Sequence, residues 1–162
     1  MKCYLCDNEA TSDEHCPPQS FFPPGRRNNL ITVPSCSTHN EETSMDDEYV
    51  RNVIAMTKGN NDVGANHFKN KGLRSLQRSV GLSNITFRNP KQLNFIKDDD
   101  KSKTMAVEVD RNRFDKVMRK IAYGIFYFKF NHTWSYKLGI ATHNLVTDSL
   151  DNRPNCRTDT IL

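Results

Sequence analysis

Two pairs of metal-binding residues, far apart in the sequence, constrain the fold of this chain more than any other feature. Cys3-x-x-Cys6 and Cys36-x-x-His39 are separated by 29 residues, and each pair has the spacing that a tetrahedral zinc ion accepts. Three thiolates and one imidazole would fill all four positions, so we expect a closed, structural zinc site rather than a catalytic one. Such an ion supplies folding free energy on the order of 10 kcal/mol. Free buried thiols or another metal are the alternatives.

The composition predicts a folded protein whose charge is unevenly distributed. The chain has 162 residues, of which 36% are hydrophobic, and its nine Phe, five Tyr and one Trp can form a modest core. Residues 1–60 hold 5 Lys and Arg against 9 Asp and Glu, whereas residues 61–162 hold 18 against 10. A basic half fits a polyanion partner, although a solvated basic surface explains the charge equally well. We expect a cytoplasmic protein without a membrane partner, because neither a membrane-spanning apolar run nor a signal peptide is found.

Turn-forming residues after Met56, in the stretch KGNNDVGAN, predict a boundary near Gly59. We therefore divide the chain into an N-terminal module, residues 1–60, and a second region, residues 61–162. In the second region, apolar spacing predicts a helix over about residues 64–80. The segments ITFRN and QLNFIK read as short strands, and TMAVEVD alternates as a half-buried strand.

The strongest helical pattern begins at Phe114 and ends at Phe128. Apolar residues recur there at a period of about 3.6 and predict one core-facing stripe, which consists of Phe114, Val117, Met118, Ile121, Ile125 and Phe128. The charged residues are assigned to the other faces: Lys116, Arg119, Lys120 and Lys129. Gly124 costs up to about 1 kcal/mol relative to Ala inside a helix. It therefore either permits close backbone packing or is merely tolerated.

The segment between the two ligand pairs carries side chains suited to phosphodiester hydrolysis. If both pairs bind one ion, the chain must loop out and return, which brings Glu14, His15 and Asn40 into one neighbourhood. A neutral imidazole can deprotonate water, and a neighbouring carboxylate can hold a divalent ion that polarises the phosphate. A surface acid at Glu14 and a helix cap at Asn40 are the simpler alternatives. The other histidines read as structural or surface residues: His67, His132 and His143.

The order of these parts resembles the HNH branch of the His-Me finger (ββα-metal) endonucleases. The resemblance covers about residues 3–57 and rests on Cys-x-x-Cys, then DEHCPPQSFFP, then NLITVPSCSTHNEETSMDDEYV. It implies that His15 activates water, that Glu14 binds the catalytic metal and that Asn40 orients the catalytic loop. The fold class it implies is α+β, with a zinc-stapled ββα-metal module followed by a mixed, mainly helical basic region.

The third signature residue departs from the family pattern, because Tyr49 stands where family members often carry a metal-binding His or Asn. Three acids lie just before it: Asp46, Asp47 and Glu48. We choose Asp47 as the second ligand of the catalytic ion, since seven residues on from Asn40 returns to the same helical face. A capping box with Ser44, or the preference of acids for the first helical turn, is the alternative.

These features predict a metal-dependent endonuclease that hydrolyses phosphodiester bonds, with DNA as the expected substrate. Its cofactors would be a structural Zn²⁺ and a catalytic Mg²⁺ or Mn²⁺. Phosphate contacts are expected from the PPGRRNN loop and the following basic helix, through Arg26, Arg27, Lys69, Lys71, Arg74 and Arg78. The alternatives are a zinc-dependent nucleic-acid-binding module that does not cleave, and a subunit that acts through a protein partner. The sequence also leaves a homo-oligomer open.

Overall fold

The chain folds into several short helices, one long helix and two hairpins, described by a computed structural model for residues 1–41, 43–57, 60–97 and 100–141. The elements are β1 (Ser12–Cys16), a 3-10 turn η1 (Gln19–Phe21), β2 (Ile31–Ser35), α1 (Ser37–Asn40), α2 (Ser44–Ala55), α3 (Asp62–His67), a π-helical turn η2 (Phe68–Gly72), α4 (Leu73–Arg78), α5 (Val80–Thr86), β3 (Lys91–Lys97), β4 (Asp100–Ala106) and α6 (Arg111–Phe130). Strands β1 and β2 form one antiparallel sheet, and β3 and β4 form another. The predicted α+β class is confirmed at this level.

The β1–β2 hairpin places neighbouring residues of the sequence on opposite faces. Its register pairs Glu14 with Val33 and His15 with Thr32. Because side chains alternate along a strand, Glu14 and Cys16 are buried against the protein, whereas His15 is half-buried on the other face of the hairpin. The strand alternation therefore separates the Glu14 carboxylate from the His15 imidazole, although the two residues are adjacent in the sequence.

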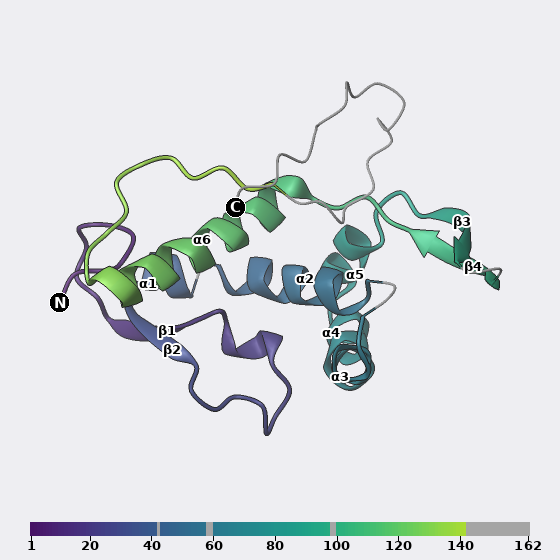
Figure 1. Cartoon of the computed structure of the whole chain (residues 1–162), viewed down its shortest axis with the longest axis horizontal. Coiled ribbons are helices and arrows are strands. Elements are labelled where there is room, and N and C mark those ends of the chain that lie inside the picture. The colour runs from purple at the N-terminus through teal and green to yellow at the C-terminus, as the bar shows by residue number, and fades with distance from the viewer. Residues whose placement is uncertain (42, 58–59, 98–99, 142–162) are drawn as a thin grey trace, which may run out of the picture.

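Helix α6 packs across both the β1–β2 hairpin and helix α2 (Figure 1). One buried cluster lies around α2 and consists of Tyr49, Val50, Val53, Leu76, Leu82, Phe114 and Val117. A second lies at the N-terminal end of the fold and consists of Cys3, Tyr4, Cys16, Val33 and Cys36. Ile121 of α6 packs against both clusters. Helix α6 thus connects the N-terminal hairpin to the helical core, while the boundary near residue 60 stays a prediction.

The backbone of α6 approaches β1 most closely at Gly124. A Cβ atom at this position would lie 2.4 Å from the Cys16 Sγ and 3.1 Å from its Cβ. The Cys16 thiol also donates a hydrogen bond to the Ile121 carbonyl at 3.1 Å. Of the two explanations for this glycine, close backbone packing is therefore the correct one.

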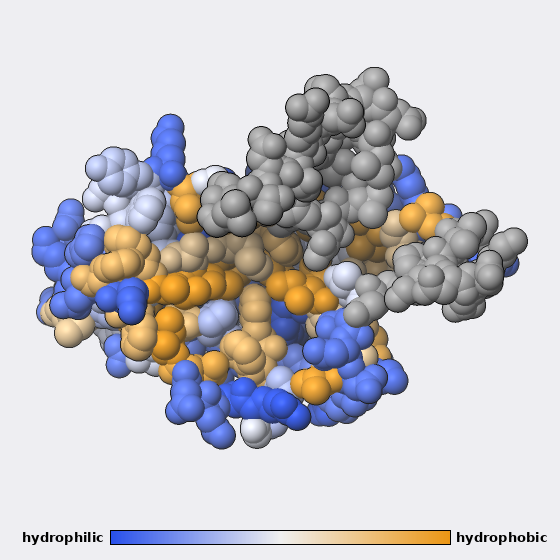
Figure 2. Space-filling model, in the orientation of Figure 1, coloured by the Kyte–Doolittle hydropathy of each residue, from blue (hydrophilic) through white to orange (hydrophobic). Residues whose placement is uncertain are grey.

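The apolar stripe of α6 is only partly buried. Phe114 and Val117 are in the core, but Ile125 and Phe128 are 48% and 58% exposed, so their assignment to the core was wrong. The buried side of the helix instead continues through Lys120, which is 5% exposed, and Gly124. Because β1 lies close to Gly124, the face of α6 that contacts the rest of the protein is the one that carries these two residues. Hydrophobic residues consequently form a band over α6 and α2 on one face of the molecule (Figure 2).

Residues 62–86 are helical almost throughout. Elements α3, η2 and α4 follow one another without a break and confirm the helix predicted from about residue 64, but Ser79 interrupts it with an extended backbone. The Ser79 side chain then caps α5 by accepting a hydrogen bond from the Leu82 backbone amide at 3.2 Å. The strand predicted for ITFRN was wrong, since Ile85 and Thr86 belong to α5. Leu82 and Thr86 are both buried at a spacing that suits a helix.

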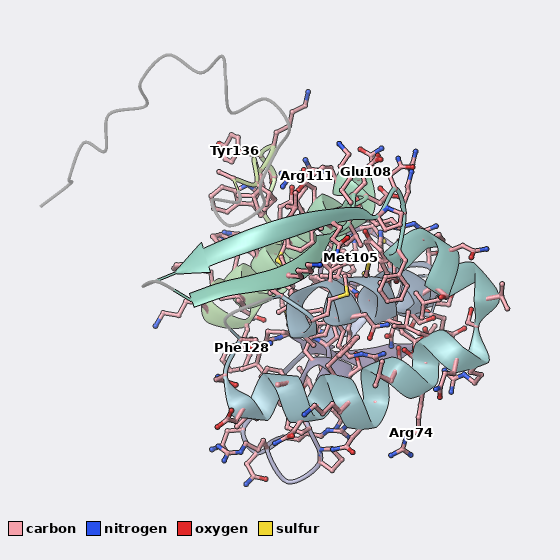
Figure 3. All side chains as sticks on the ribbon, turned by 90° about the vertical axis from the view of Figure 1, so that its right-hand side faces the viewer. Arg74, Met105, Glu108, Arg111, Phe128 and Tyr136 are labelled. Carbon is pink, nitrogen blue, oxygen red and sulfur yellow. The ribbon has the colours of Figure 1, made fainter. Side chains whose placement is uncertain are left out.

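The β3–β4 hairpin lies along one side of the molecule (Figure 3). Strand β3 confirms the strand predicted for QLNFIK. The strand predicted for residues 104–110 is confirmed only as far as Ala106. Beyond it, the Glu108 amide donates a hydrogen bond to the Arg88 carbonyl at 2.9 Å and does not pair with β3. The Asp110 side chain then caps α6 by accepting from the Arg113 amide. No helix in the described part of the chain is long and apolar enough to cross a lipid bilayer.

Candidate metal centre and functional site

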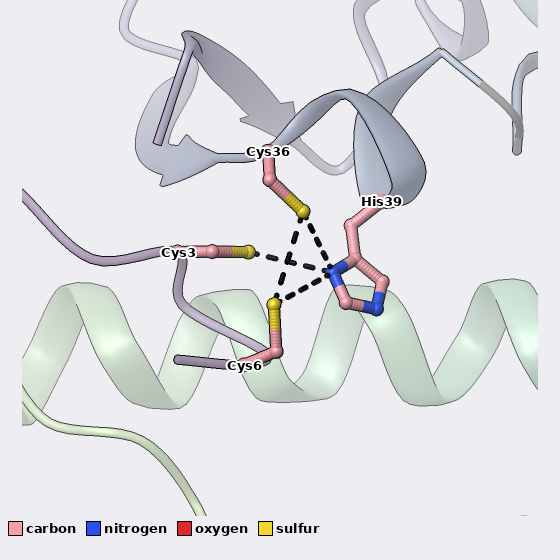
Figure 4. A group of neighbouring side chains, drawn as sticks. All are labelled: Cys3, Cys6, Cys36 and His39. Atoms are coloured by element: carbon pink, nitrogen blue, oxygen red, sulfur yellow. Dashed lines mark hydrogen bonds between the residues drawn. The ribbon is translucent and has the colours of Figure 1, made fainter. Parts of the chain in front are cut away.

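Four side chains from the N-terminal loop and the β2–α1 junction converge at one point (Figure 4). Cys3 and Cys6 come from the loop before β1, Cys36 follows β2, and His39 lies in α1. Their ligand atoms all lie within 4.8 Å of one another. Backbone hydrogen bonds hold the loop against β2, from the Tyr4 amide to the Pro34 carbonyl at 2.8 Å and from the Thr11 amide to the Ser35 carbonyl at 3.0 Å.

The spacing of these atoms fits a tetrahedral zinc site. Zinc bonds of about 2.3 Å to sulfur and about 2.0 Å to nitrogen place two sulfur ligands about 3.8 Å apart and a sulfur and a nitrogen about 3.5 Å apart. The Cys6 and Cys36 sulfurs are 3.8 Å apart. The His39 Nδ1 lies 3.5 Å from Cys3, 3.5 Å from Cys6 and 3.3 Å from Cys36. The group could therefore bind zinc, and all three sulfurs and the nitrogen are placed to do so together.

The Glu14 carboxylate points into the protein, where each of its oxygens has a partner. The Tyr4 hydroxyl donates to Oε2 at 3.1 Å and the Ser35 hydroxyl donates to the same oxygen at 3.2 Å. The Lys120 ammonium lies 2.7 Å from Oε1. Burial, reinforced by the negative charge of Glu14, raises the pKa of Tyr4 well above its usual range. Tyr4 is therefore a fixed hydrogen-bond donor to this carboxylate.

Asp47, in the first turn of α2, faces Glu14 across the same ammonium group. The Lys120 Nζ lies 2.8 Å from Asp47 Oδ2 and donates to the Thr43 hydroxyl at 2.9 Å. The other carboxylate oxygen of Asp47 is buried and has no hydrogen-bond partner within the residues that the structure describes. Burial raises the pKa of Asp47, although the charge of Lys120 opposes the shift. No side-chain cap starts α2, so the capping box with Ser44, which was the alternative explanation for Asp47, is not formed.

Lys120 is the residue of this site that sequence reasoning missed. The apolar stripe predicted from the sequence places Lys120 on one of the charged faces of the helix. The available signal was its position, three residues after Val117 and four before Gly124, which puts it on the side of the helix that carries both. The structure thus brings the two predicted carboxylate ligands together, and a lysine ammonium lies between them.

His15 and Asn40 lie at the edge of this arrangement. His15 is half-buried on the opposite face of β1 from Glu14. The Asn40 amide donates to the Ser12 hydroxyl at 2.9 Å, which ties the end of α1 to the beginning of β1. Asn40 does not cap α2, because Thr43 occupies that position. It is placed to hold the strand that carries His15.

Three of the six predicted phosphate-contacting residues share one groove. Arg26, Lys71 and Arg74 line it, together with prolines of the loop before Arg26 and polar residues of α3 and η2, and its volume is about 490 Å³. The His67 Nε2 lies 2.9 Å from the Ser20 carbonyl and joins the two walls. Burial, followed by the charges of Arg51 and Arg27, lowers the pKa of Lys71.

The other three predicted basic residues lie outside the lining of this groove. The Arg27 Nε donates to the Phe22 carbonyl at 3.1 Å, and Arg78 forms an ion pair of 3.4 Å with Glu48. Lys69 is exposed on η2. The basic groove is therefore formed by fewer residues than the sequence predicted.

No protein-family model, curated protein or solved structure matches this chain. The likeness to HNH endonucleases thus stays a prediction from the motifs and their order.

Proposed function

We propose that this protein is an endonuclease of the HNH type, which hydrolyses phosphodiester bonds in nucleic acid, with DNA as the expected substrate. The observation that carries the proposal is the convergence of Glu14 and Asp47 on a single cation position, 2.7 and 2.8 Å from one ammonium nitrogen. This position lies between β1 and α2, which both pack against α6. The four zinc-spaced ligands lie in the loop before β1 and at the β2–α1 junction.

The donor atoms around this position suit a catalytic Mg²⁺ or Mn²⁺. Two carboxylates and a hydroxyl are the hard oxygen ligands that these ions prefer. The Oδ1 of Asp47, which has no hydrogen-bond partner among the described residues, supplies one more ligand atom. A divalent ion bound there would polarise the phosphate and stabilise the developing alkoxide. Glu14 and Asp47 would hold it, and Lys120 would have to leave its present place.

The remaining site residues act on the water and on the backbone of the substrate. His15 is the general base and accepts a proton from the attacking water. Its half-exposed ring lies on the face of β1 opposite Glu14, so the substrate must reach around the edge of the hairpin to meet both the ring and the ion. Asn40 is a positioning residue, because the hydrogen bond from its side-chain amide to the Ser12 hydroxyl fixes β1 three residues before His15. Arg26 and Lys71 contact phosphates in the basic groove, which gives affinity without sequence preference.

A plasmid-cleavage assay with Mg²⁺ or Mn²⁺ tests the proposal on zinc-loaded protein. We expect the parent protein to nick or linearise the plasmid, and His15→Ala to lower the rate by about 100-fold or more. His132→Ala is the matched control, because His132 is an exposed histidine whose hydrogen bond to the Phe130 carbonyl and ring contacts with Phe126 and Phe130 all involve the end of α6. Zinc content must equal that of the parent in both variants. Equal cleavage by His15→Ala and the parent would contradict the role of His15.

The position of Lys120 favours a second candidate function, a zinc-dependent nucleic-acid-binding module that does not cleave. Its ammonium already neutralises one carboxylate charge at the predicted catalytic position and is only 5% exposed. A parent protein that shifts DNA in a gel but leaves it intact at every divalent ion concentration would support this candidate over the nuclease.

A further inference from the structure

We infer that Lys120 is the resident cation of the Glu14–Asp47 site, and that a divalent ion binds there only in exchange for its ammonium group. The consequence of this exchange, control of catalysis, rests on the proposed function. The exchange itself is tested by metal binding, which does not depend on cleavage. It assigns a regulatory role to a residue outside the stretch that resembles the nuclease family.

The ammonium of Lys120 has the surroundings of a bound ion. It meets one oxygen from each of three residues: Glu14 Oε1 at 2.7 Å, Asp47 Oδ2 at 2.8 Å and Thr43 Oγ1 at 2.9 Å. The Thr43 hydroxyl gives its own proton to the His39 carbonyl, so its oxygen is free to accept. A lysine has three N–H donors, and each has an acceptor here. The group is therefore fully coordinated without solvent.

Two cations cannot share this position. Mg²⁺ requires oxygen ligands at about 2.0–2.1 Å in a near-octahedral arrangement, whereas the ammonium nitrogen already lies within hydrogen-bonding distance of all three oxygens. The charge balance also favours exchange, because Glu14 and Asp47 with one ammonium leave a net negative charge and an Asp47 oxygen for which the described part of the chain offers no hydrogen-bond partner. Replacement of the ammonium by a divalent ion would neutralise the pair completely.

The exchange needs movement of a side chain but not of the helix. One turn after Lys120, Gly124 packs directly on Cys16, and one turn before it Val117 is completely buried. The backbone on either side of Lys120 is therefore held in place. The lysine stem is flexible, and it is the only part that must leave. The adjacent turn offers a contrast: the Lys116 Nζ lies 2.8 Å from Asp46, but the Lys116 side chain is 54% exposed.

Binding of Mn²⁺ to the zinc-loaded protein, followed by the electron paramagnetic resonance signal of free Mn²⁺, tests the exchange directly. Lys120→Met leaves both carboxylates without their cation, so we expect Mn²⁺ to bind at least about tenfold more tightly than to the parent. Lys116→Met is the matched control and should change the affinity by less than about twofold, because exposed ion pairs are weak. Adding Asp47→Asn to Lys120→Met should remove the gain. Unchanged affinity in folded Lys120→Met would overturn the inference.

A second measurement uses the parent protein in case Lys120→Met fails to fold, as judged by zinc content and circular dichroism. Reductive methylation with mass spectrometry reports which lysines are reachable. We expect Lys120 to be protected without divalent ions and to become methylated as Mg²⁺ is raised, while the exposed Lys116 is methylated throughout. Protection of Lys120 at every Mg²⁺ concentration would then overturn the exchange.

The outcomes separate this inference from the proposed nuclease function. Tighter Mn²⁺ binding by Lys120→Met, with no cleavage by any variant, would support the exchange and contradict the nuclease. Cleavage by the parent that depends on His15, with the same Mn²⁺ affinity in Lys120→Met, would support the nuclease and contradict the exchange.

Discussion

Replacing Gly124 by Ala tests whether α6 sits directly on β1, the contact that brings Lys120 to Glu14. The new Cβ would lie 2.4 Å from the Cys16 Sγ and 3.1 Å from the Cys16 Cβ. A carbon and a sulfur atom cannot approach so closely, so the buried Cys16 side chain must turn or the helix and the strand must move apart. Movement would also stretch the hydrogen bond from the Cys16 thiol to the α6 backbone, which is 3.1 Å long.

The size of the effect follows from two opposing contributions. Ala is favoured over Gly inside a helix by about 1 kcal/mol, whereas an extra methyl group in a packed core costs about 1–3 kcal/mol. The Cβ–Sγ distance of 2.4 Å places Gly124→Ala at the upper end of that range. We therefore expect the free energy of unfolding to fall by about 2 kcal/mol.

Urea unfolding followed by circular dichroism, at a fixed zinc concentration, measures this change. Gly81→Ala is the matched control, because Gly81 also lies in a helix and a Cβ there would meet nothing within 4 Å. It should be neutral or stabilising by up to about 1 kcal/mol. Removing the opposing sulfur with Cys16→Ala should recover part of the loss in the double variant. If Gly124→Ala proves as stable as Gly81→Ala, the close packing of α6 on β1 is refuted.

Three further predictions concern the four potential zinc ligands, the buried Tyr4 and the basic groove. Cys6→Ser should lose the one zinc ion per chain and much of the folded signal, measured by elemental analysis and circular dichroism; full zinc content would contradict the four-ligand site. Burial raises the pKa of Tyr4, so the folded protein keeps a proton that the unfolded chain releases above about pH 10. Stability should therefore fall with rising pH there, by up to about 1.4 kcal/mol per pH unit for this proton, and Tyr4→Phe should flatten the slope. For DNA binding, the double variant Lys71→Gln, Arg74→Gln should lower the slope of the logarithm of the binding constant against the logarithm of the salt concentration by about 1 for each residue. Arg88→Gln should leave it unchanged, since Arg88 pairs with Glu108, which lies far from Arg74 in Figure 3.

The cluster of four potential zinc ligands could be predicted from the sequence because its chemistry is local. Cys3-x-x-Cys6 and Cys36-x-x-His39 each fit one ion within a single turn, and the structure needs only to bring two such turns together. The long helix was predictable for a similar reason, since its period is contained in its own residues. A tertiary partner was needed to decide which face is buried. That partner is β1, which covers the side of α6 that carries Gly124, while the side that carries Phe128 stays exposed.

The strand predicted for ITFRN failed because β-branched and aromatic residues do not exclude a helix when tertiary contacts favour it. Ser79 supplies a helix cap, and Leu82 and Thr86 then share one buried face. The same limit applies to TMAVEVD, whose alternation continues past the strand. The Glu108 amide finds its partner in Arg88, twenty residues earlier, and no pattern within the segment reveals that contact.

The buried ion cluster shows why the partners of the acids could not be inferred from the stretch that resembles a nuclease. Glu14 and Asp47 lie within that stretch, but their common partner Lys120 comes from the second half of the chain, 73 residues after Asp47. Two carboxylates enclosed without a cation would cost several kcal/mol, so a fold that brings them together must provide a positive charge before any ion arrives. Lys120 provides it with complete coordination. A divalent ion must therefore bind more strongly than this ammonium, and the ion dependence of any cleavage would measure that difference.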